Sequence, residues 1–471
     1  MVLAGLRTRR AVIADAKPRP FYGWRVVSAA FVLAVFGWGI GFYGPPVFLS
    51  VLRETRGWPV ALISTAVTVH FLIGAVVGAN LPAFYRCFGA ATVTKAGSIC
   101  MAAGVLIWAT AATPWQLLVA GVFSGAGWGA TSASAINAIV SPWFVRTRPA
   151  ALGTAYNGAS IGGVIFSPLW VAAIGTLGFR IAAAAISFAM VLTVWLLAAR
   201  WFSRTPQDMG QEPDGDFPSM AATSVTSPAA KPLPGPLLWK DRAFLTLSAG
   251  MALGLFAQIG LTAHLFSLLV PALGAQRTGF AMASVTAMAI VGRSLLGWAM
   301  PLKADRRLVA CAGYAAQFTG SIVFIAAAGT SVPFMLLGVV LFGAGFGSAT
   351  SLPPLIAQRE FVKDDVPRVV ALIVGIAQGA YAFAPAIFGL VREIAPHVPS
   401  APAPSASGVF AAAALAQGLA ICAFLAGRER QRKTDHGTRP SGEHRRHGSE
   451  RARKALRPRI GRASPRPHGF S

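Results

Sequence analysis

Long apolar runs separated by short charged connections fill this chain from about residue 21 to residue 427. A helix rises about 1.5 Å per residue, so roughly twenty apolar residues cross the hydrocarbon layer of a membrane. Only 12% of the residues are charged, against about 25% in soluble domains. This leaves too little polar surface for a water-soluble globule, so a soluble enzyme or regulator is excluded. The pattern indicates a protein that crosses a membrane many times.

Twelve of these runs are long enough to cross a bilayer as helices. The predicted crossings are residues 25–52, 60–85, 90–112, 115–144, 150–177, 181–199, 243–271, 280–301, 308–330, 333–358, 369–391 and 407–427. Basic residues precede the first run, as in a secretory signal, but the run is too long and no clear cleavage site follows it. We therefore interpret it as the first helix of an all-α integral membrane fold.

The connection 201–241 divides the twelve helices into six and six. It is rich in Pro, Ser and acidic residues, which is typical of a flexible linker. The sequence Phe-Ser-Gly-Ala-Gly-Trp-Gly at 123–129 resembles Leu-Phe-Gly-Ala-Gly-Phe-Gly at 341–347, an offset of 218. Its glycines are spaced for close helix packing. We predict two pseudo-symmetric six-helix bundles, at 25–200 and 242–427, with terminal segments 1–24 and 428–471.

Positive charge is distributed unevenly over the two sides of the predicted membrane. With both termini on one side, that side carries 21 Lys and Arg residues before the tail is counted, and the opposite side carries five. Because cytoplasmic connections collect Lys and Arg, we expect both termini in the cytoplasm and the protein in the bacterial inner membrane. The net charge of +25 lies mostly at helix ends and in the tail, so it does not indicate nucleic-acid binding.

The tail from residue 428 to residue 471 holds 14 Lys and Arg residues against 4 Asp and Glu. We expect a disordered cytoplasmic segment attracted to anionic lipid, with regulation or partner binding as the alternative. The chain contains no HExxH, GxSxG or GxxxxGK motif, and its four cysteines stand singly. We therefore expect no catalytic residue, no metal site and no cofactor.

Arg293 stands about midway along the eighth predicted helix and is the one basic residue assigned to the inside of a crossing. All 16 acidic residues are assigned to termini and connections, so Arg293 has no acidic partner within the helices. Charged groups at membrane depth are costly and mark substrate paths. We predict that Arg293 binds a translocated anion. Alternatively, its guanidinium bonds backbone carbonyls or water, or reaches an interface.

Other polar side chains fall within the apolar helices, and each has two interpretations. His70 in the second helix and His264 in the seventh could bind substrate or carry a proton, or could be structural. The remaining candidates for a polar substrate cavity are Tyr43, Asn157, Gln258, Gln378 and Tyr381. The alternative is that they bond across helices. With no carboxylate inside a helix, any coupled proton would have to use a histidine or the substrate itself.

Four stretches together resemble the major facilitator superfamily, and within it the bacterial relatives of monocarboxylate transporters and oxalate/formate exchangers. They are Phe21-Tyr22-Gly23-Trp24, the sequence Pro-Trp-Phe-Val-Arg-Thr-Arg-Pro-Ala-Ala-Leu-Gly at 142–153, His264-Leu265, and Gly292-Arg293-Ser294-Leu295-Leu296-Gly297. The resemblance covers about 21–427. It implies two six-helix halves that rock about a central site, with Arg293 at the place of the arginine thought to engage the substrate carboxylate.

The chain departs from the family pattern at several places. Ala289 stands where proton-coupled members often have an acidic residue, and Gln378 and Tyr381 stand near the lysine of the oxalate exchangers. The gating motif after the second helix is eroded to Tyr-Arg-Cys-Phe-Gly-Ala at 85–90, and a displaced Asp305-Arg306 follows the eighth helix. These differences argue against a dianion held by two cations and against family-type gating contacts.

From these observations we expect a secondary transporter of a small organic anion, a monocarboxylate in particular, working by alternating access. The main alternative is an efflux carrier for amphipathic drugs or metabolites in the same fold, which the eroded motifs and the many Phe and Trp residues favour. A transport-fold sensor acting through the basic tail is a third hypothesis. An integral-membrane enzyme is disfavoured because no catalytic constellation was found.

Overall fold

The computed structural model describes residues 21–215, 235–299, 304–362, 364–394 and 404–428. Every regular element in these ranges is a helix. Ten helical stretches of the described residues are long and apolar enough to cross a membrane, and two of them, 23–56 and 368–394, each contain a break between two helices. The predicted all-α membrane fold is confirmed. Most of the predicted segment 1–24, the middle of the linker and nearly all of the basic tail lie outside the described residues.

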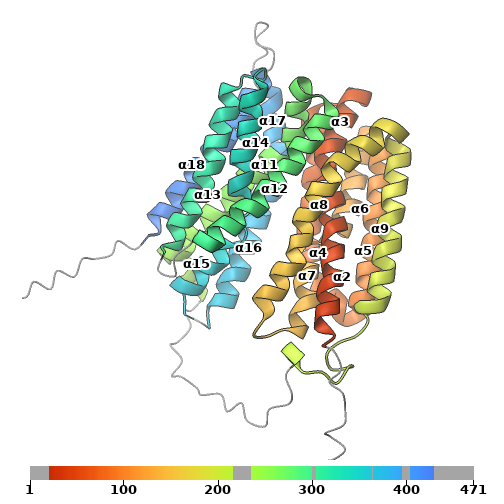
Figure 1. The fold of residues 1–471 in the computed structure, drawn as a ribbon, viewed down its shortest axis with the longest axis vertical. Coiled ribbons are helices and arrows are strands. Elements are labelled where there is room, and N and C mark those ends of the chain that lie inside the picture. Colours follow the sequence, from red (N-terminus) through yellow and green to blue (C-terminus); the bar gives the residue numbers. More distant parts are fainter. Residues whose placement is uncertain (1–20, 216–234, 300–303, 363, 395–403, 429–471) are drawn as a thin grey trace, which may run out of the picture. The chain divides into compact units, whose positions relative to one another are not determined.

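The first six crossings form one group of helices, coloured red to yellow in Figure 1. We call this group the first half. Its helices are α2 (Gly23–Gly41), α3 (Gly44–Arg56), α4 (Val60–Phe88), α5 (Ala90–Thr110), α6 (Pro114–Thr131), α7 (Ala133–Val140), α8 (Arg148–Leu177) and α9 (Phe179–Trp201).

The last six crossings form a second group, coloured green to blue, which we call the second half (Figure 1). Its helices are α11 (Arg242–Leu273), α12 (Ala275–Ala299), α13 (Arg306–Ala326), α14 (Val332–Phe346), α15 (Leu352–Glu360), α16 (Val366–Ala382), α17 (Ala384–Ile394) and α18 (Pro404–Ala426). The short α10 (Gly235–Leu238) precedes α11. The division within 201–241 agrees with this grouping, and the domain boundaries themselves stay a prediction.

Four predicted helices differ from expectation because each is divided in two. The first predicted helix is divided into α2 and α3, and the fourth into α6 and α7. The tenth is divided into α14 and α15, and the eleventh into α16 and α17. Proline stands in the first three residues of three of the second pieces, at Pro45, Pro353 and Pro385. Proline lacks the N–H that would continue the preceding helix, so a helix breaks just before it.

The helix starts are set by local side-chain caps. The Asp241 carboxylate accepts a hydrogen bond of 2.8 Å from the amide of Phe244 at the start of α11. Asp305 accepts one of 2.9 Å from the amide of Arg307 at the start of α13. Thr113 and Gln116 form a capping box at the start of α6. These caps satisfy amides that have no partner inside the helix.

The glycine stripes pack helices together in the same way in both halves. A Cβ atom on Gly121 of α6 would lie 2.6 Å from the carbonyl oxygen of Ala66 on α4. A Cβ atom on Gly343 of α14 would lie 2.6 Å from the carbonyl oxygen of Val285 on α12. The predicted sequence repeat is therefore also a repeat of helix packing, and the glycines serve close approach.

The two halves meet at the ends of the helices that are opposite the linker, which we call the far end. Here α3 contacts α11, α4 contacts α16 and α17, and α8 contacts α12. The amide of Ala386 donates to the Thr68 hydroxyl at 3.1 Å, and the amide of Ala61 donates to Glu393 at 2.9 Å. At the other end, which we call the linker end, α7 and α15 pack against helices of their own half.

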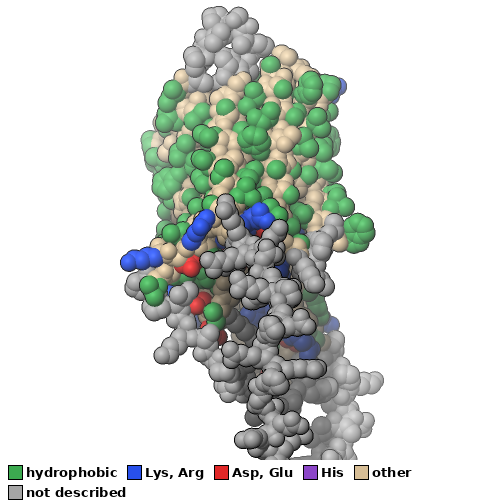
Figure 2. Space-filling view, turned by 90° about the vertical axis from the view of Figure 1, so that its left-hand side faces the viewer, with side chains coloured by type: hydrophobic (Ala, Val, Ile, Leu, Met, Phe, Trp, Pro, Cys, Tyr) green, Lys and Arg blue, Asp and Glu red, His purple; other side chains and the backbone are tan. Residues whose placement is uncertain are grey.

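The outward-facing side chains are hydrophobic over most of the helix length. Phe188 is 70% exposed, Leu415 67% and Ile181 60%. Figure 2 shows hydrophobic side chains spread over one face, with most of the visible charged side chains toward the lower end. A water-soluble surface would not expose so much contiguous apolar area, whereas a lipid-facing surface requires it.

Candidate functional site

Arg293 lies on α12 with its guanidinium partly buried between helices. Its Nε atom donates to the carbonyl oxygen of Gly347, at the end of α14, over 3.0 Å. Within the described ranges its two terminal nitrogens have no hydrogen-bond partner, and the guanidinium forms no ion pair. One edge of the guanidinium is thus held by the backbone, and the forked end stays available for a ligand.

The predicted residue Tyr43 is brought close to Arg293 by the packing of three helices. Tyr43 stands at the break between α2 and α3, is 5% exposed, and has its hydroxyl beside Thr286 and within reach of the charge of Arg293. A Cβ atom on Gly163 of α8 would lie 2.5 Å from Tyr43 Cζ and 2.7 Å from Thr286 Oγ1. Thr286 is seven residues before Arg293, on the same helix face. This contact joins the two halves.

A row of aromatic rings connects Tyr43 with the predicted residues of the eleventh helix. The rings of Phe42 and Tyr43 are 5.0 Å apart, those of Phe42 and Phe71 6.3 Å, and those of Phe71 and Tyr381 5.9 Å. Gln378 lies one helical turn before Tyr381 on α16. Tyr43 and Tyr381 therefore stand at the two ends of one row of rings between the halves, and their role in a shared site, with that of Gln378, stays a prediction.

His70 lies elsewhere, inside the first half, where it is 1% exposed. Its Nδ1 atom is 2.9 Å from the Ser124 hydroxyl, which also accepts a hydrogen bond of 3.4 Å from the indole of Trp108. His70 thus bonds across α4, α5 and α6. No described contact connects it with Arg293, but its ring lies 5.1 Å from that of Phe71, and its Nε2 atom is buried without a described partner. Both interpretations of His70 stay predictions.

His264 on α11 is fully buried, and its Nε2 atom is 3.0 Å from the carbonyl oxygen of Pro385. Nearby, Arg392 is 7% exposed and donates from Nη1 to the Ser267 hydroxyl at 2.6 Å. This differs from the prediction, in which the eleventh crossing ends at residue 391 and Arg392 is counted with the far-side connections. The α17 helix continues to Ile394, so Arg392 lies within a helix that packs on α11. The signal that could have found it is helical spacing from Pro385.

The two remaining candidates have no described contact with Arg293. Gln258 on α11 is 2% exposed, and its Oε1 atom has no hydrogen-bond partner among the residues described. Asn157 on α8 is exposed, and no side-chain hydrogen bond is described for it. The membership of both residues in the site therefore stays a prediction.

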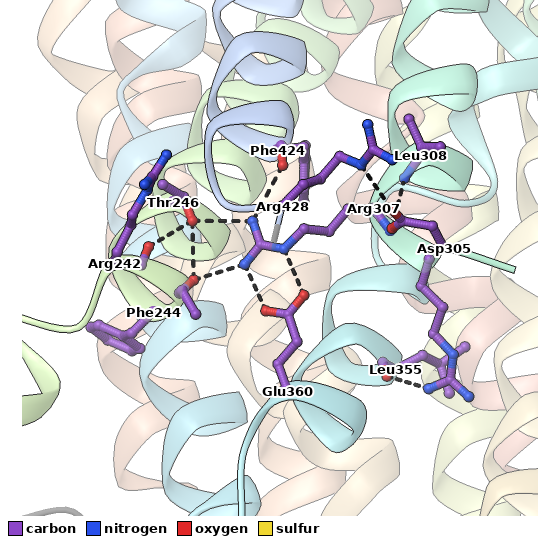
Figure 3. A network of polar contacts seen from close by, with 12 residues as sticks. Arg242, Phe244, Thr246, Asp305, Arg307, Leu308, Leu355, Glu360, Phe424 and Arg428 are labelled. Atoms are coloured by element: carbon purple, nitrogen blue, oxygen red, sulfur yellow. Dashed lines mark hydrogen bonds and ion pairs between the residues drawn. The ribbon is translucent and has the colours of Figure 1, made fainter. Parts of the chain in front are cut away.

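At the linker end the second half contains a buried ion pair, shown in Figure 3. Arg307 is 1% exposed, and its Nε and Nη2 atoms lie 2.6 and 2.7 Å from the two carboxylate oxygens of Glu360. It also donates to the carbonyl of Ala243 and the hydroxyl of Thr246. Asp305 of the displaced motif pairs with Arg428 at 2.7 Å. These contacts hold α11, α13, α15 and α18 together.

A small pocket lies between the halves and is largely apolar. Its lining residues are Phe42, Pro45, Pro46, Val67, Phe71, Ile259, Thr262 and Ala263. It therefore adjoins the aromatic row rather than Arg293. The described residues contain no cluster of three or more His, Cys, Asp or Glu side chains that could hold a metal ion.

Two helical halves joined at one end, with an arginine and a tyrosine from different halves at their interface, are an arrangement typical of membrane transporters. The model of the Major Facilitator Superfamily matches residues 27–389. The chain belongs to this superfamily.

Two relatives share part of the sequence. The chain is 30% identical to the MFS transporter asaE of Aspergillus flavus over 205 residues, which is 41% of this chain and 44% of that protein. It is 27% identical to monocarboxylate transporter 13 of Bos taurus over 288 residues, 59% of this chain and 61% of that protein. Both matches span less than two thirds of the relative.

Solved structures share the fold at low sequence identity. A mutant of the nucleoside transporter NupG superimposes with a TM-score of 0.67 at 13% identity, covering 86% of this chain and 100% of that one. An inward-facing, unoccupied bacterial homologue of the human lysosomal transporter Spinster gives 0.66 at 14% identity, covering 87% and 98%. These likenesses establish the arrangement of helices.

Proposed function

We propose that this transporter carries a small organic anion, a monocarboxylate in particular, by alternating access across the cell membrane. The observation that carries the proposal is the guanidinium of Arg293, which lies near Tyr43. Its two terminal nitrogens have no hydrogen-bond partner among the residues described. The partial likeness to a protein named as a monocarboxylate transporter supports the same substrate class.

The chemistry of the site suits one carboxylate. The fork of an arginine matches the two oxygens of a carboxylate, and such charge-assisted pairs are the stronger hydrogen bonds in proteins. Because Nε of Arg293 is held by Gly347, the forked end is oriented before the anion arrives. The Tyr43 hydroxyl can donate a further hydrogen bond. A single cation at this place favours a monoanion over a dianion.

The test is counterflow in proteoliposomes with labelled acetate, L-lactate, pyruvate and benzoate, because counterflow requires no knowledge of the coupling ion. We expect exchange of at least one carboxylate and at least a hundredfold loss in Arg293→Ala. Arg277→Ala is the matched control, because Arg277 is exposed on the same helix. Exchange that is unchanged in a folded Arg293→Ala protein would contradict the anion-binding role.

The aromatic row favours one other substrate class. The rings of Phe42, Phe71 and Tyr381 offer an apolar surface between the halves, which suits an amphipathic drug or metabolite. Efflux of such a compound is the second candidate function. Increased drug resistance of a sensitive host on expression, without carboxylate counterflow, would select it.

A further inference from the structure

Arg392 is more deeply buried than Arg293 and likewise has no described ion-pair partner, and these two features together indicate an arginine that binds an anion. It is 7% exposed, and its only described side-chain hydrogen bond runs from Nη1 to the Ser267 hydroxyl. Its Nε atom is buried without a partner, and no described carboxylate forms an ion pair with it. The adjacent Glu393 is engaged elsewhere, because its carboxylate accepts from the amide of Ala61.

A second buried polar atom without a hydrogen-bond partner lies where α11 packs against α17, which we call the α11–α17 seam. His264 is one helical turn before Ser267, and its Nε2 atom faces the carbonyl oxygen of Pro385. A carbonyl can only accept, so Nε2 carries the proton and a neutral ring leaves a lone pair on Nδ1. That Nδ1 atom is buried without a partner. The seam thus contains one free donor and one free acceptor.

The first half brings another positive charge to the same place. Arg53, on α3, lies close enough for its charge to act on that of Arg392. In the part of the chain that is described, neither guanidinium has an ion-pair partner. Taking a guanidinium out of water costs several kcal/mol unless an opposite charge compensates it. Arg53 is exposed to solvent, so this cost falls on the buried Arg392, whose guanidinium therefore requires a small anion or water beside it.

We propose that Arg392 binds the carboxylate of the transported anion at the far end of the path, as a second position separate from Arg293, with the positive charge of Arg53 nearby. The inference rests on the proposed function in that the ligand is the transported anion. Ser267 holds Nη1 of Arg392, so the Nε–H edge is oriented for a carboxylate oxygen. A water bound to the same carboxylate would donate to Nδ1 of His264.

The place of Arg392 in the fold explains what this second position would do. Arg392 is two residues from the far end of α17, whereas Arg293 lies on α12 toward its linker end. An anion that enters from the far side would meet Arg392 and Arg53 before Arg293. Paired positive charges at an entrance raise the local concentration of anions and their rate of capture.

The experiment compares half-saturating concentrations on the two sides of proteoliposomes that contain the oriented full-length protein. The probe is the labelled carboxylate that exchanges fastest among acetate, L-lactate, pyruvate and benzoate. In Arg392→Gln, which removes the charge but keeps a polar amide, we expect a rise of at least tenfold for substrate presented at the far side. This is the effect of losing one hydrogen bond to a charged group, about 1.5–3 kcal/mol. The linker-side value should stay within twofold.

Two further variants separate binding from folding. Arg180→Gln removes an exposed far-end arginine and should change neither value. Ser267→Ala keeps the charge of Arg392 but loses its positioning bond, and we expect a smaller far-side rise, about threefold or more. If Arg392→Gln fails to fold, Ser267→Ala decides the question. A far-side value that is unchanged, or equal changes on both sides, would overturn the inference.

Chloride carries the same charge as a carboxylate, so its binding is tested in a separate part of the experiment. Chloride is varied from low to high concentration with sulfate holding the ionic strength. Competition by chloride that disappears in Arg392→Gln would assign the position to an inorganic anion and overturn the carboxylate proposal. If Arg293→Ala stops exchange while Arg392→Gln leaves the far side unchanged, the proposed function stands and only this inference fails. No exchange of any carboxylate would overturn both.

Discussion

At the scale of single residues, the contact between the halves depends on Gly163, because glycine has no Cβ atom. Gly163 leaves room for the ring of Tyr43 and the hydroxyl of Thr286, which would otherwise lie 2.5 and 2.7 Å from its Cβ atom. Tyr43 comes from the first half and Thr286 from the second. A side chain at position 163 would therefore push apart the contact that brings Tyr43 to the level of Arg293.

We predict that Gly163→Ala lowers the melting temperature of the purified protein and slows counterflow several-fold. Inserting a methyl group into a filled site costs about 1–3 kcal/mol. Gly175→Ala is the matched control on the same helix, because nothing lies within 4 Å of its Cβ position. Its melting temperature should stay equal or rise. Equal losses in the two variants would contradict the role given to Gly163.

Asp214 is a second residue whose surroundings make a specific prediction. Its carboxylate accepts from the amides of Val145, Arg146 and Thr147 at 3.0, 2.7 and 3.0 Å. It also accepts from the Thr147 hydroxyl. Burial acts to raise the pKa of Asp214, but these hydrogen bonds outweigh it and hold that pKa well below its usual value. The start of the linker is thereby tied to the connection before α8.

A carboxylate with a depressed pKa stabilises the fold above its unfolded pKa of about 3.9, and the contribution is lost as the pH falls further. We predict that the melting temperature of the unmodified protein falls below about pH 4, and that Asp214→Asn loses less over the same window. At pH 7 the variant should melt lower. Glu212→Gln, which changes an exposed neighbour, should keep the unmodified pH profile. An identical profile in Asp214→Asn would refute the assignment.

At the scale of elements, α4 and α17 cap each other across the two halves. Pro59 precedes α4 and supplies no side-chain cap, and the amide of Ala61 donates instead to Glu393 on α17. In return, the amide of Ala386 near the start of α17 donates to Thr68 on α4. Each helix therefore satisfies an end amide of the other, and opening the far end would leave both amides without these partners.

We predict that removing both caps shifts the protein toward a state open at the far end. Ser64, fully buried near Gly389 of α17, is replaced by Cys in a background without native cysteines. Adding Thr68→Val and Glu393→Ala should raise its maleimide labelling rate roughly tenfold, because each cap contributes about 0.5–2 kcal/mol. Glu54→Ala, which removes an exposed far-end carboxylate, should leave the labelling rate unchanged. An unaltered rate would show that these caps do not hold the far end closed.

At the scale of the whole molecule, one continuous hydrophobic cluster contains residues of both halves. Val47 and Phe71 of the first half belong to it together with Leu265 and Phe388 of the second. A separate cluster around Leu255 and Phe424 lies within the second half. Alternating access would have to separate the first cluster at the far end, while the Arg307–Glu360 pair moves as part of one rigid half.

The distribution of positive charge predicts the orientation of the molecule in the membrane. With 21 Lys and Arg on the linker side before the tail and five on the opposite side, we expect the linker in the cytoplasm. In intact cells, a membrane-impermeant maleimide should label Arg277→Cys at the far end. It should label Asp208→Cys in the linker only after permeabilisation. The reverse pattern would overturn the proposed orientation.

The candidate site was only partly predictable. Arg293 could be proposed from sequence because an uncompensated cation in an apolar run is a local feature. Its pairing with Tyr43 through Thr286 depends on the packing of α3, α8 and α12, which no spacing rule shows. His70 was a candidate because a polar side chain in an apolar helix is also a local feature, and only the packing shows that its Nδ1 atom lies beside Ser124 inside the first half.

By itself the sequence determined the membrane class, the approximate positions of twelve crossings and the unequal charge of the two sides. These follow from hydropathy and charge summed over consecutive residues. The tertiary structure alone decided where four helices break and that Arg392 is buried beside Ser267. It also decided which polar side chains meet at the interface. The physical reason is that burial and partners depend on which helix faces are pressed together, and those faces come from segments hundreds of residues apart.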